Sequence, residues 1–226
     1  MARIITIETS GGVSSIALSV DGQCLAVHSA EGHEQTHSLT IYIEKLLSDS
    51  ELTIEQIDAI AVSAGPGSYT GLRIGVSVAK GICFAGGKKL IAIPTLQALT
   101  FGAMKLYASK LKPQTILIPM IDARRMEIYT ATYNSVAEEI SPVEAMIVDE
   151  NSFASLRGKE VISFGSGAAK CNSILGFNVV EVPLSAQWLC SAAEQKFNNS
   201  DFEDVAYFEP AYLKEFVALT SQKKYF

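Results

Sequence analysis

The chain has 226 residues, of which 48% are hydrophobic and 19% charged, and its formal net charge is −6. A chain of this length can bury enough apolar surface to fold as one or two domains without disulfides. The sequence has no apolar run of the roughly 18 residues that span a bilayer, and it opens on a strand-like run rather than a signal-peptide pattern. Because affinity for phosphate backbones comes largely from Lys and Arg, the acidic balance argues against strong binding of tRNA or DNA by this chain alone.

Cysteine usage gives an indication of the compartment. The four cysteines, Cys24, Cys83, Cys171 and Cys190, show no metal-ligand spacing. Scattered thiols of this kind are typical of reduced packing residues, so we expect a cytoplasmic protein.

The first quarter of the chain has clear element signals. The predicted strands are residues 4–9, 14–20, 23–29 and 59–62. Between the second and third of these, Asp21-Gly22 is a strong hairpin signal. Apolar residues at i, i+3, i+4, i+7 and i+8 over residues 39–47 predict a helix with one buried face. Thr53 with Gln56 matches a capping box for a short helical turn.

A Gly- and Pro-rich loop follows the fourth predicted strand, in the stretch SAGPGSYTGLRIGVSVAKG of residues 63–81. Gly65, Pro66 and Gly67 predict a tight turn, because Gly tolerates positive φ and Pro fixes its own φ. We expect Gly67 to need a conformation that a β-carbon would strain. Hydroxyls precede a predicted helix over residues 72–85, whose N-terminus could hold a phosphate or carboxylate.

Two familiar phosphate loops do not match this stretch. A P-loop needs Gly, then Lys, then Ser or Thr, whereas Gly71 is followed by Leu72 and Arg73. The dinucleotide fingerprint needs a third Gly where Thr70 stands. The pattern itself leaves two interpretations open: a ligand-binding loop, or a structural turn from strand to helix.

The second half of the chain repeats this order of elements less clearly. Predicted strands at residues 116–121 and 127–134 are joined by a turn at 122–125. A helix over residues 96–107 forms the predicted junction between the halves, and helix signals return at 185–197. No residue-level repeat is visible.

Several short motifs point to one family. They are Ile7-Glu8-Thr9-Ser10, Ser15-Ile16-Ala17-Leu18, the run from Gly65 to Gly75, Ile121-Asp122-Ala123-Arg124-Arg125, Glu127-Ile128-Tyr129, Gly165-Ser166-Gly167-Ala168 and Glu209-Pro210-Ala211-Tyr212-Leu213-Lys214. Together they resemble the TsaB family, also called YeaZ, a non-catalytic paralogue of TsaD in bacterial tRNA threonylcarbamoyladenosine biosynthesis. The first blocks also fit TsaD, whereas the short length, the central Asp-Ala-Arg-Arg and the late Pro-x-Tyr-Leu favour TsaB.

The resemblance implies an α/β fold of two actin-like ATPase (ASKHA) subdomains, each a mixed β-sheet flanked by helices. It divides the chain into an N-terminal subdomain at residues 1–104 and a C-terminal one at 105–226, with the last helix packing back on the first. The predicted order of three strands, helix, strand and helix agrees with one half of that architecture.

The resemblance also implies a scaffold without catalysis of its own. In the family, TsaB binds and activates TsaD. Together with the ATPase TsaE, the complex transfers a threonylcarbamoyl group to N6 of adenosine 37 in tRNAs reading codons that begin with A. We therefore expect TsaD and TsaE as partners, with a homodimer as the alternative for the isolated chain. No cofactor is expected in this chain, because ATP and metal are expected on the partner proteins.

Two groups of residues are candidate sites. A vestigial phosphate loop would comprise Glu8, Thr9, Ser10, Gly65, Gly67, Ser68, Thr70 and Asp122. The alternative role of its carboxylates is to cap or hydrogen-bond loops at strand ends. The partner interface that the resemblance implies would comprise His37, Ile41, Lys45, Arg73, Gly75, Val78, Gly81, Ile82 and Ala85. On sequence alone, the helix at 72–85 fits burial in the chain's own core equally well.

A histidine cluster supports a different class of function. His28, His33 and His37 lie within one ten-residue window, and the last two are four apart, so on a helix they would share a face as paired zinc ligands do. No third ligand is evident nearby, and we expect no metal. The alternatives to a scaffold are a metal-dependent peptidase of the M22 type, supported only by this pair, and a small-molecule kinase of the same fold, which the missing phosphate loop disfavours.

Overall fold

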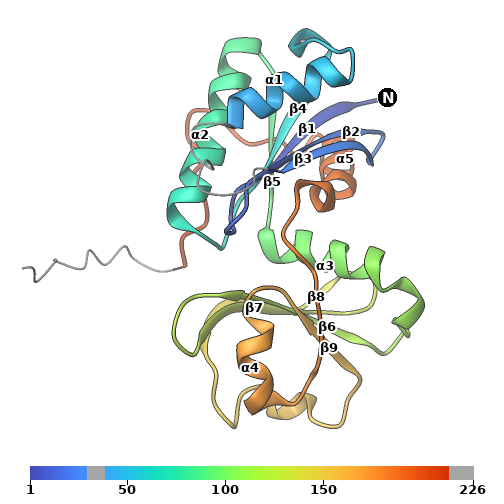
Figure 1. Cartoon of the computed structure of the whole chain (residues 1–226), viewed down its shortest axis with the longest axis vertical. Coiled ribbons are helices and arrows are strands. Elements are labelled where there is room, and N and C mark those ends of the chain that lie inside the picture. The colour runs from blue at the N-terminus through green and yellow to red at the C-terminus, as the bar shows by residue number, and fades with distance from the viewer. Residues whose placement is uncertain (30–38, 214–226) are drawn as a thin grey trace, which may run out of the picture.

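Two five-stranded mixed sheets, one above the other in Figure 1, form the framework of the molecule. The computed structural model describes residues 1–29 and 39–213. The first sheet contains β1 (Arg3–Glu8), β2 (Ser15–Val20), β3 (Gln23–Ser29), β4 (Ala59–Ser63) and β5 (Lys89–Ile93). The second contains β6 (Ile116–Asp122), β7 (Glu127–Tyr133), β8 (Glu139–Ile147), β9 (Val161–Phe164) and β10 (Asn178–Val180). The helices are α1 (Leu39–Asp49), α2 (Tyr69–Gly86), α3 (Thr95–Leu106), α4 (Ala168–Leu175) and α5 (Cys190–Asn198).

The two sheets have the same topology. The first has the strand order β3-β2-β1-β4-β5, and the second, taken from the corresponding edge, has β8-β7-β6-β9-β10. In each sheet the first three strands form an antiparallel meander, and the fourth and fifth run parallel to the first. The same strand topology therefore occurs twice in the chain. This confirms the predicted class of two mixed sheets flanked by helices.

Local sequence signals account for the first elements. Asp21 and Gly22 have φ values of 49° and 75°, so both residues of the β2–β3 turn take the left-handed conformation that such hairpins require. The backbone N–H of Thr53 donates to Gln56 Oε1 at 2.9 Å at the start of the short helix η2 (Ile54–Gln56), as the capping box predicts. The hairpin and the capped turn are both confirmed.

The two faces of the first sheet are covered by different helices. Alternate residues of a strand point to opposite faces, so Ile5 and Ile7 of β1 pack with α1 and α2, whereas Ile4 packs with α3 and α5. The predicted apolar stripe of α1 is confirmed at Leu39 and Leu46, which are buried in the first of these layers.

The helix α3 lies between the two sheets (Figure 1) and links their cores. Ala98 packs in the cluster beneath the first sheet, while Leu96 and Leu99 pack against the second. After β10 the chain returns through the short helix η5 (Ala186–Leu189), and α5 then contacts β1, β2 and β5. Residues 186–198 thus pack on the first sheet, although they follow the second in sequence; the exact subdomain boundaries stay a prediction.

Several elements have no counterpart among the sequence predictions. They are β5, β8, β9, β10 and α4. The strands β9 and β10 have only four and three residues, too few for a periodic signal. The strand β8 contains Pro142, and a proline within a segment argues against predicting a strand from sequence. Pro142 is tolerated because β8 is an edge strand of its sheet. Among the described residues, no helix is both long and apolar enough to cross a membrane.

Candidate functional site

The loop between β4 and α2 is fixed by its own backbone contacts. Gly65 has a φ of 99°, a conformation that only glycine adopts without strain. Its N–H donates to Thr95 Oγ1 at 3.1 Å, and its carbonyl accepts from the Thr95 N–H at 2.9 Å. A β-carbon at Gly65 would also lie 2.7 Å from the carbonyl oxygen of Ala211, so the C-terminal segment packs directly on this turn.

Three glycines at intervals of four residues bring α2 against the turn after β1. A β-carbon would lie 2.5 Å from the Ser10 carbonyl oxygen at Gly67, 2.0 Å from the Thr9 carbonyl oxygen at Gly71 and 2.2 Å from Thr9 Oγ1 at Gly75. Real β-carbons essentially never approach other atoms within 3.0 Å, so only glycine fits these places. Gly67 does not have a positive φ, so the expected backbone strain is not the reason that glycine is needed here. The reason is that a β-carbon at Gly67 would have no space beside Ser10.

Two backbone N–H groups at the start of α2 are hydrogen-bonded within the protein. The N–H of Ser68 donates to the Ser10 carbonyl at 2.7 Å. The Ser68 hydroxyl accepts from the Gly71 N–H at 3.2 Å and so serves as the helix N-cap. These are N–H groups that a helix N-terminus would otherwise present to a phosphate. Thr70 is exposed in the first turn of the same helix.

Glu8 is the last residue of β1 and directly precedes the turn that α2 contacts. It is fully buried, and its Oε1 accepts from the Ser10 N–H at 2.6 Å and from the Ser10 hydroxyl at 2.5 Å. Burial raises the pKa of the Glu8 carboxyl, against the lowering effect of hydrogen bonds from Ser10 and Ser63. Among the described residues, Glu8 Oε2 and the neighbouring Thr9 Oγ1 find no hydrogen-bond partner. The carboxyl therefore organises the β1–β2 turn, which is the second of the two roles considered for it.

Asp122, at the end of β6, occupies the equivalent position in the second sheet. Its Oδ1 accepts from the Lys170 ammonium group and from the Arg124 N–H, the latter at 2.8 Å. Partial burial acts to raise the pKa of Asp122, but these two hydrogen bonds and the positive charges of Lys170 and Arg124 together hold it below its ordinary value. Lys170 also donates to the carbonyls of Arg125 and Glu127, each at 2.7 Å, and thereby holds the whole β6–β7 turn to α4.

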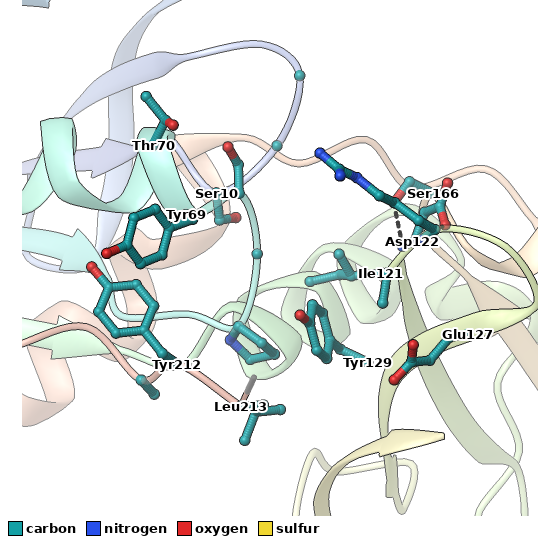
Figure 2. A pocket seen from close by; sticks show the side chains of 18 of the residues that line it. Ser10, Tyr69, Thr70, Ile121, Asp122, Glu127, Tyr129, Ser166, Tyr212 and Leu213 are labelled. Atoms are coloured by element: carbon teal, nitrogen blue, oxygen red, sulfur yellow. Dashed lines mark hydrogen bonds between the residues drawn. The ribbon is translucent and has the colours of Figure 1, made fainter. Parts of the chain in front are cut away.

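A cleft of about 910 Å³ separates the two loops. Figure 2 shows Ser10, Tyr69, Thr70 and Tyr212 on one side of it and Asp122 and Glu127 on the other. Of the predicted phosphate-loop residues, those that line the cleft are Ser10, Gly67, Ser68, Thr70 and Asp122. Glu8, Thr9 and Gly65 are buried behind its wall.

Sequence reasoning did not assign several residues of the cleft to a site. Tyr129 and Ser166 contribute from the second sheet, and Ser166 Oγ accepts from the Asp122 N–H at 3.0 Å. Tyr212 packs on Tyr69 with 4.8 Å between ring centroids, on the same side of the cleft. These three residues occur only within the family motifs, because no local sequence pattern connects residues that lie so far apart in the chain.

The predicted partner interface falls on α1 and α2, which contact each other on one face of the first sheet. Ile41, Lys45, Arg73, Gly81 and Ala85 are exposed, and Val78 and Ile82 are half-buried. Gly75 is buried against Thr9 on the other side of α2, so it serves internal packing. His37 lies outside the described residues. Phe84, which was not predicted, is 85% exposed on α2.

The histidine cluster is described only in part. His28 on β3 lies with Nε2 3.5 Å from the Asp49 carboxylate at the end of α1. The pair His33 and His37 lies outside the described residues. Within residues 1–29 and 39–213, no three His, Cys, Asp or Glu side chains are grouped closely enough to hold a metal ion.

Comparison with known proteins gives consistent matches. The model of the family "TsaD: tRNA N6-adenosine threonylcarbamoyltransferase" matches residues 27–218. The tRNA threonylcarbamoyladenosine biosynthesis protein TsaB of Escherichia coli is 28% identical over 96% of both chains. Its namesake in Haemophilus influenzae is 33% identical over 56% of this chain and 51% of that protein. The solved structure of YeaZ from Pseudomonas aeruginosa has a TM-score of 0.79 and 23% identity, covering 94% of this chain and 100% of that chain.

More distant solved structures show the wider class. The activator of 2-hydroxyisocaproyl-CoA dehydratase from Clostridium difficile has a TM-score of 0.52 and 10% identity, covering 88% of this chain and 97% of that one. The duplicated sheets with a cleft between them thus define a protein of the actin-like ATPase fold, as predicted. The chain belongs to the TsaD family, and its resemblance to the TsaB proteins within that family is confirmed.

Proposed function

We propose that this chain takes part in tRNA threonylcarbamoyladenosine biosynthesis as a non-catalytic subunit that binds and activates TsaD. With the ATPase TsaE, that complex would transfer the threonylcarbamoyl group to N6 of adenosine 37 in tRNAs reading codons that begin with A. Support for the pathway comes from the TsaB relatives, one of which matches over 96% of both chains. ATP and metal would be bound by the partner proteins.

The observation that carries the non-catalytic role is the contact between α2 and the turn after β1. In a nucleotide-binding protein of this fold, the loop ends and the helix N-terminus must leave N–H groups free for phosphate oxygens. Here the Ser68 N–H is bonded to the Ser10 carbonyl, and Gly67 and Gly71 leave no space between the helix and the turn. Across the cleft, Oδ1 of the Asp122 carboxylate is already engaged by the Lys170 ammonium group and the Arg124 N–H.

The surface of α1 and α2 supports the binding role. We define the partner surface as Ile41, Lys45, Arg73, Val78, Gly81, Ile82, Phe84 and Ala85. Ile41 is 61% exposed and Phe84 85% exposed, so two large apolar side chains face solvent on neighbouring helices. Large apolar side chains that are exposed on a surface are typical of protein interfaces. A net charge of −6 is consistent with a subunit whose partner, rather than the subunit itself, binds the RNA.

Gly81→Leu tests the proposal. A β-carbon at Gly81 meets no atom of residues 1–29 or 39–213 within 4 Å, so we expect bulk there to leave the packing of these residues undisturbed. Gly12→Leu, at another open glycine that lines the cleft, is the matched control.

We expect Gly81→Leu to melt no lower than the wild type while TsaD binding and threonylcarbamoyl transfer by the complex fall at least tenfold. Gly12→Leu should keep both. Normal TsaD binding by Gly81→Leu would contradict the proposed surface. Loss of transfer in Gly12→Leu alone would instead assign the function to the cleft.

A further inference from the structure

Two cysteines far apart in sequence meet beneath the first sheet. Cys24 on β3 packs against a small cluster formed by Ala17, Ala186 and Cys190. Cys190 is the first residue of α5 and only 1% exposed, whereas Cys24 is half-buried and therefore reachable from solvent. The other two cysteines, Cys83 and Cys171, are buried in separate clusters.

The surroundings lower the pKa of one of the four thiols and raise the pKa of the other three. The pKa of Cys24 is lowered to about 7, chiefly by a hydrogen bond from the Cys190 thiol to the Cys24 thiolate. The positive charge of Lys105 also lowers this pKa, whereas burial acts to raise it. The same contact and burial raise the pKa of Cys190. Burial raises the pKa of Cys83 to about 11 and also raises that of Cys171. Because the thiolate is the nucleophile, Cys24 is the one expected to react at neutral pH.

We propose that Cys24 and Cys190 form a dithiol that hydroperoxides oxidise to an intramolecular disulfide. The Cys24 thiolate attacks the O–O bond, giving Cys24 sulfenic acid and an alkoxide or hydroxide that takes up the proton Cys24 lost. The Cys190 sulfur then attacks the sulfenic sulfur, the S–O bond breaks, and the hydroxyl leaves with the Cys190 proton as water. In total, two thiols and one hydroperoxide give one disulfide, one alcohol or water, and one water.

The position of the pair determines what the disulfide would do. It would join β3 to α5, and α5 is the segment that returns to the first sheet after the second one. The pair lies with α5 and η5, whereas α1 and α2 pack on the opposite face of the sheet. Oxidation should therefore stabilise the chain by closing a long loop without touching the partner surface, so this inference stands apart from the proposed function.

The test is oxidation of the full chain by hydrogen peroxide at neutral pH, followed by non-reducing peptide mapping. We expect a linked peptide pair containing Cys24 and Cys190, with a mass lower by two hydrogens. The melting temperature should rise by roughly 5 to 10 °C, as expected for closure of a long loop in a chain of this size, and fall back on reduction. TsaD binding, if present, should be unaffected.

Variants separate this site from general thiol oxidation. Cys171→Ser, at a buried cysteine outside the pair, should form the disulfide as the wild type does, whereas Cys24→Ser should form none and show no rise in melting temperature. Alkylation of Cys24 in the untreated wild type should be at least tenfold faster than that of Cys83. A Cys24 that remains a thiol, or is converted to sulfinic acid without pairing to Cys190, would overturn the proposal.

Discussion

Two Gly→Ala substitutions in the same helix should have opposite effects on stability. In the part of the chain that the structure describes, no atom lies within 4 Å of a β-carbon added at Gly81, so Gly81→Ala should gain only the helix propensity of Ala. That gain is about 1 kcal/mol, or roughly 2 to 4 °C in melting temperature. At Gly71 the added carbon would lie 2.0 Å from the Thr9 carbonyl oxygen, well inside the 3.4 Å at which ordinary contact begins. Because that atom belongs to the backbone, α2 or the β1–β2 turn must move.

Overpacking of this kind costs about 1 to 3 kcal/mol, which exceeds the propensity gain and should lower the melting temperature of Gly71→Ala by several degrees. Differential scanning calorimetry of the two variants beside the wild type provides the measurement. If Gly71→Ala melts at or above the wild type, the helix and turn are not in the close contact described, and the argument that they leave no room for a phosphate fails.

Two further predictions concern ionisable groups. Burial raises the pKa of Glu8 above its ordinary 4.5, so the folded state holds the proton more tightly than the unfolded state and the wild type should lose stability as pH rises above that value. Glu8→Gln lacks this loss, and denaturant unfolding should show its stability relative to the wild type increasing from about pH 4 to about pH 7; parallel curves would refute the buried ionisation. Replacement of His33 and His37 together by Ala should leave melting and activity of the complex nearly intact. Stoichiometric zinc or iron in the wild type, lost in that double variant, would support the peptidase alternative instead.

The sequence predicts those elements whose signals are local. The Asp21-Gly22 hairpin, the capped turn at Thr53 and the stripe of α1 each depend on residues within a few positions of one another, and all three are present. The strand β5 was missed because its five residues begin at Lys89 and show no alternation of polar and apolar residues. Both of its faces are covered, since Leu90 packs in one layer and Ile91 and Ile93 in the other, although β5 lies at the edge of the sheet. In the second sheet, β9 and β10 have four and three residues and give only weak signals.

The candidate sites could not be predicted in full, because they depend on contacts between residues far apart in sequence. The spacing of Gly67, Gly71 and Gly75 is visible in the sequence, but the Thr9 and Ser10 atoms that make these glycines necessary come from another strand. For the same reason the sequence could not assign Gly75 to the buried side of α2 or show Lys170 bound to Asp122. Phe84 lies in a helix that is apolar almost throughout, so only the structure shows that this side chain is exposed.

The central claim is that the chain binds TsaD through α1 and α2, and the affinity of a charged variant tests it most directly. Phe84→Asp places a carboxylate on the partner surface, and Ile147→Asp makes the same kind of change at a 73% exposed apolar residue on β8. With purified TsaD and isothermal titration calorimetry, we expect Phe84→Asp to weaken binding more than tenfold, a loss above about 1.4 kcal/mol, and Ile147→Asp to bind as the wild type does. Equal affinity of both variants for TsaD, or no binding of TsaD by the wild type, would contradict the account.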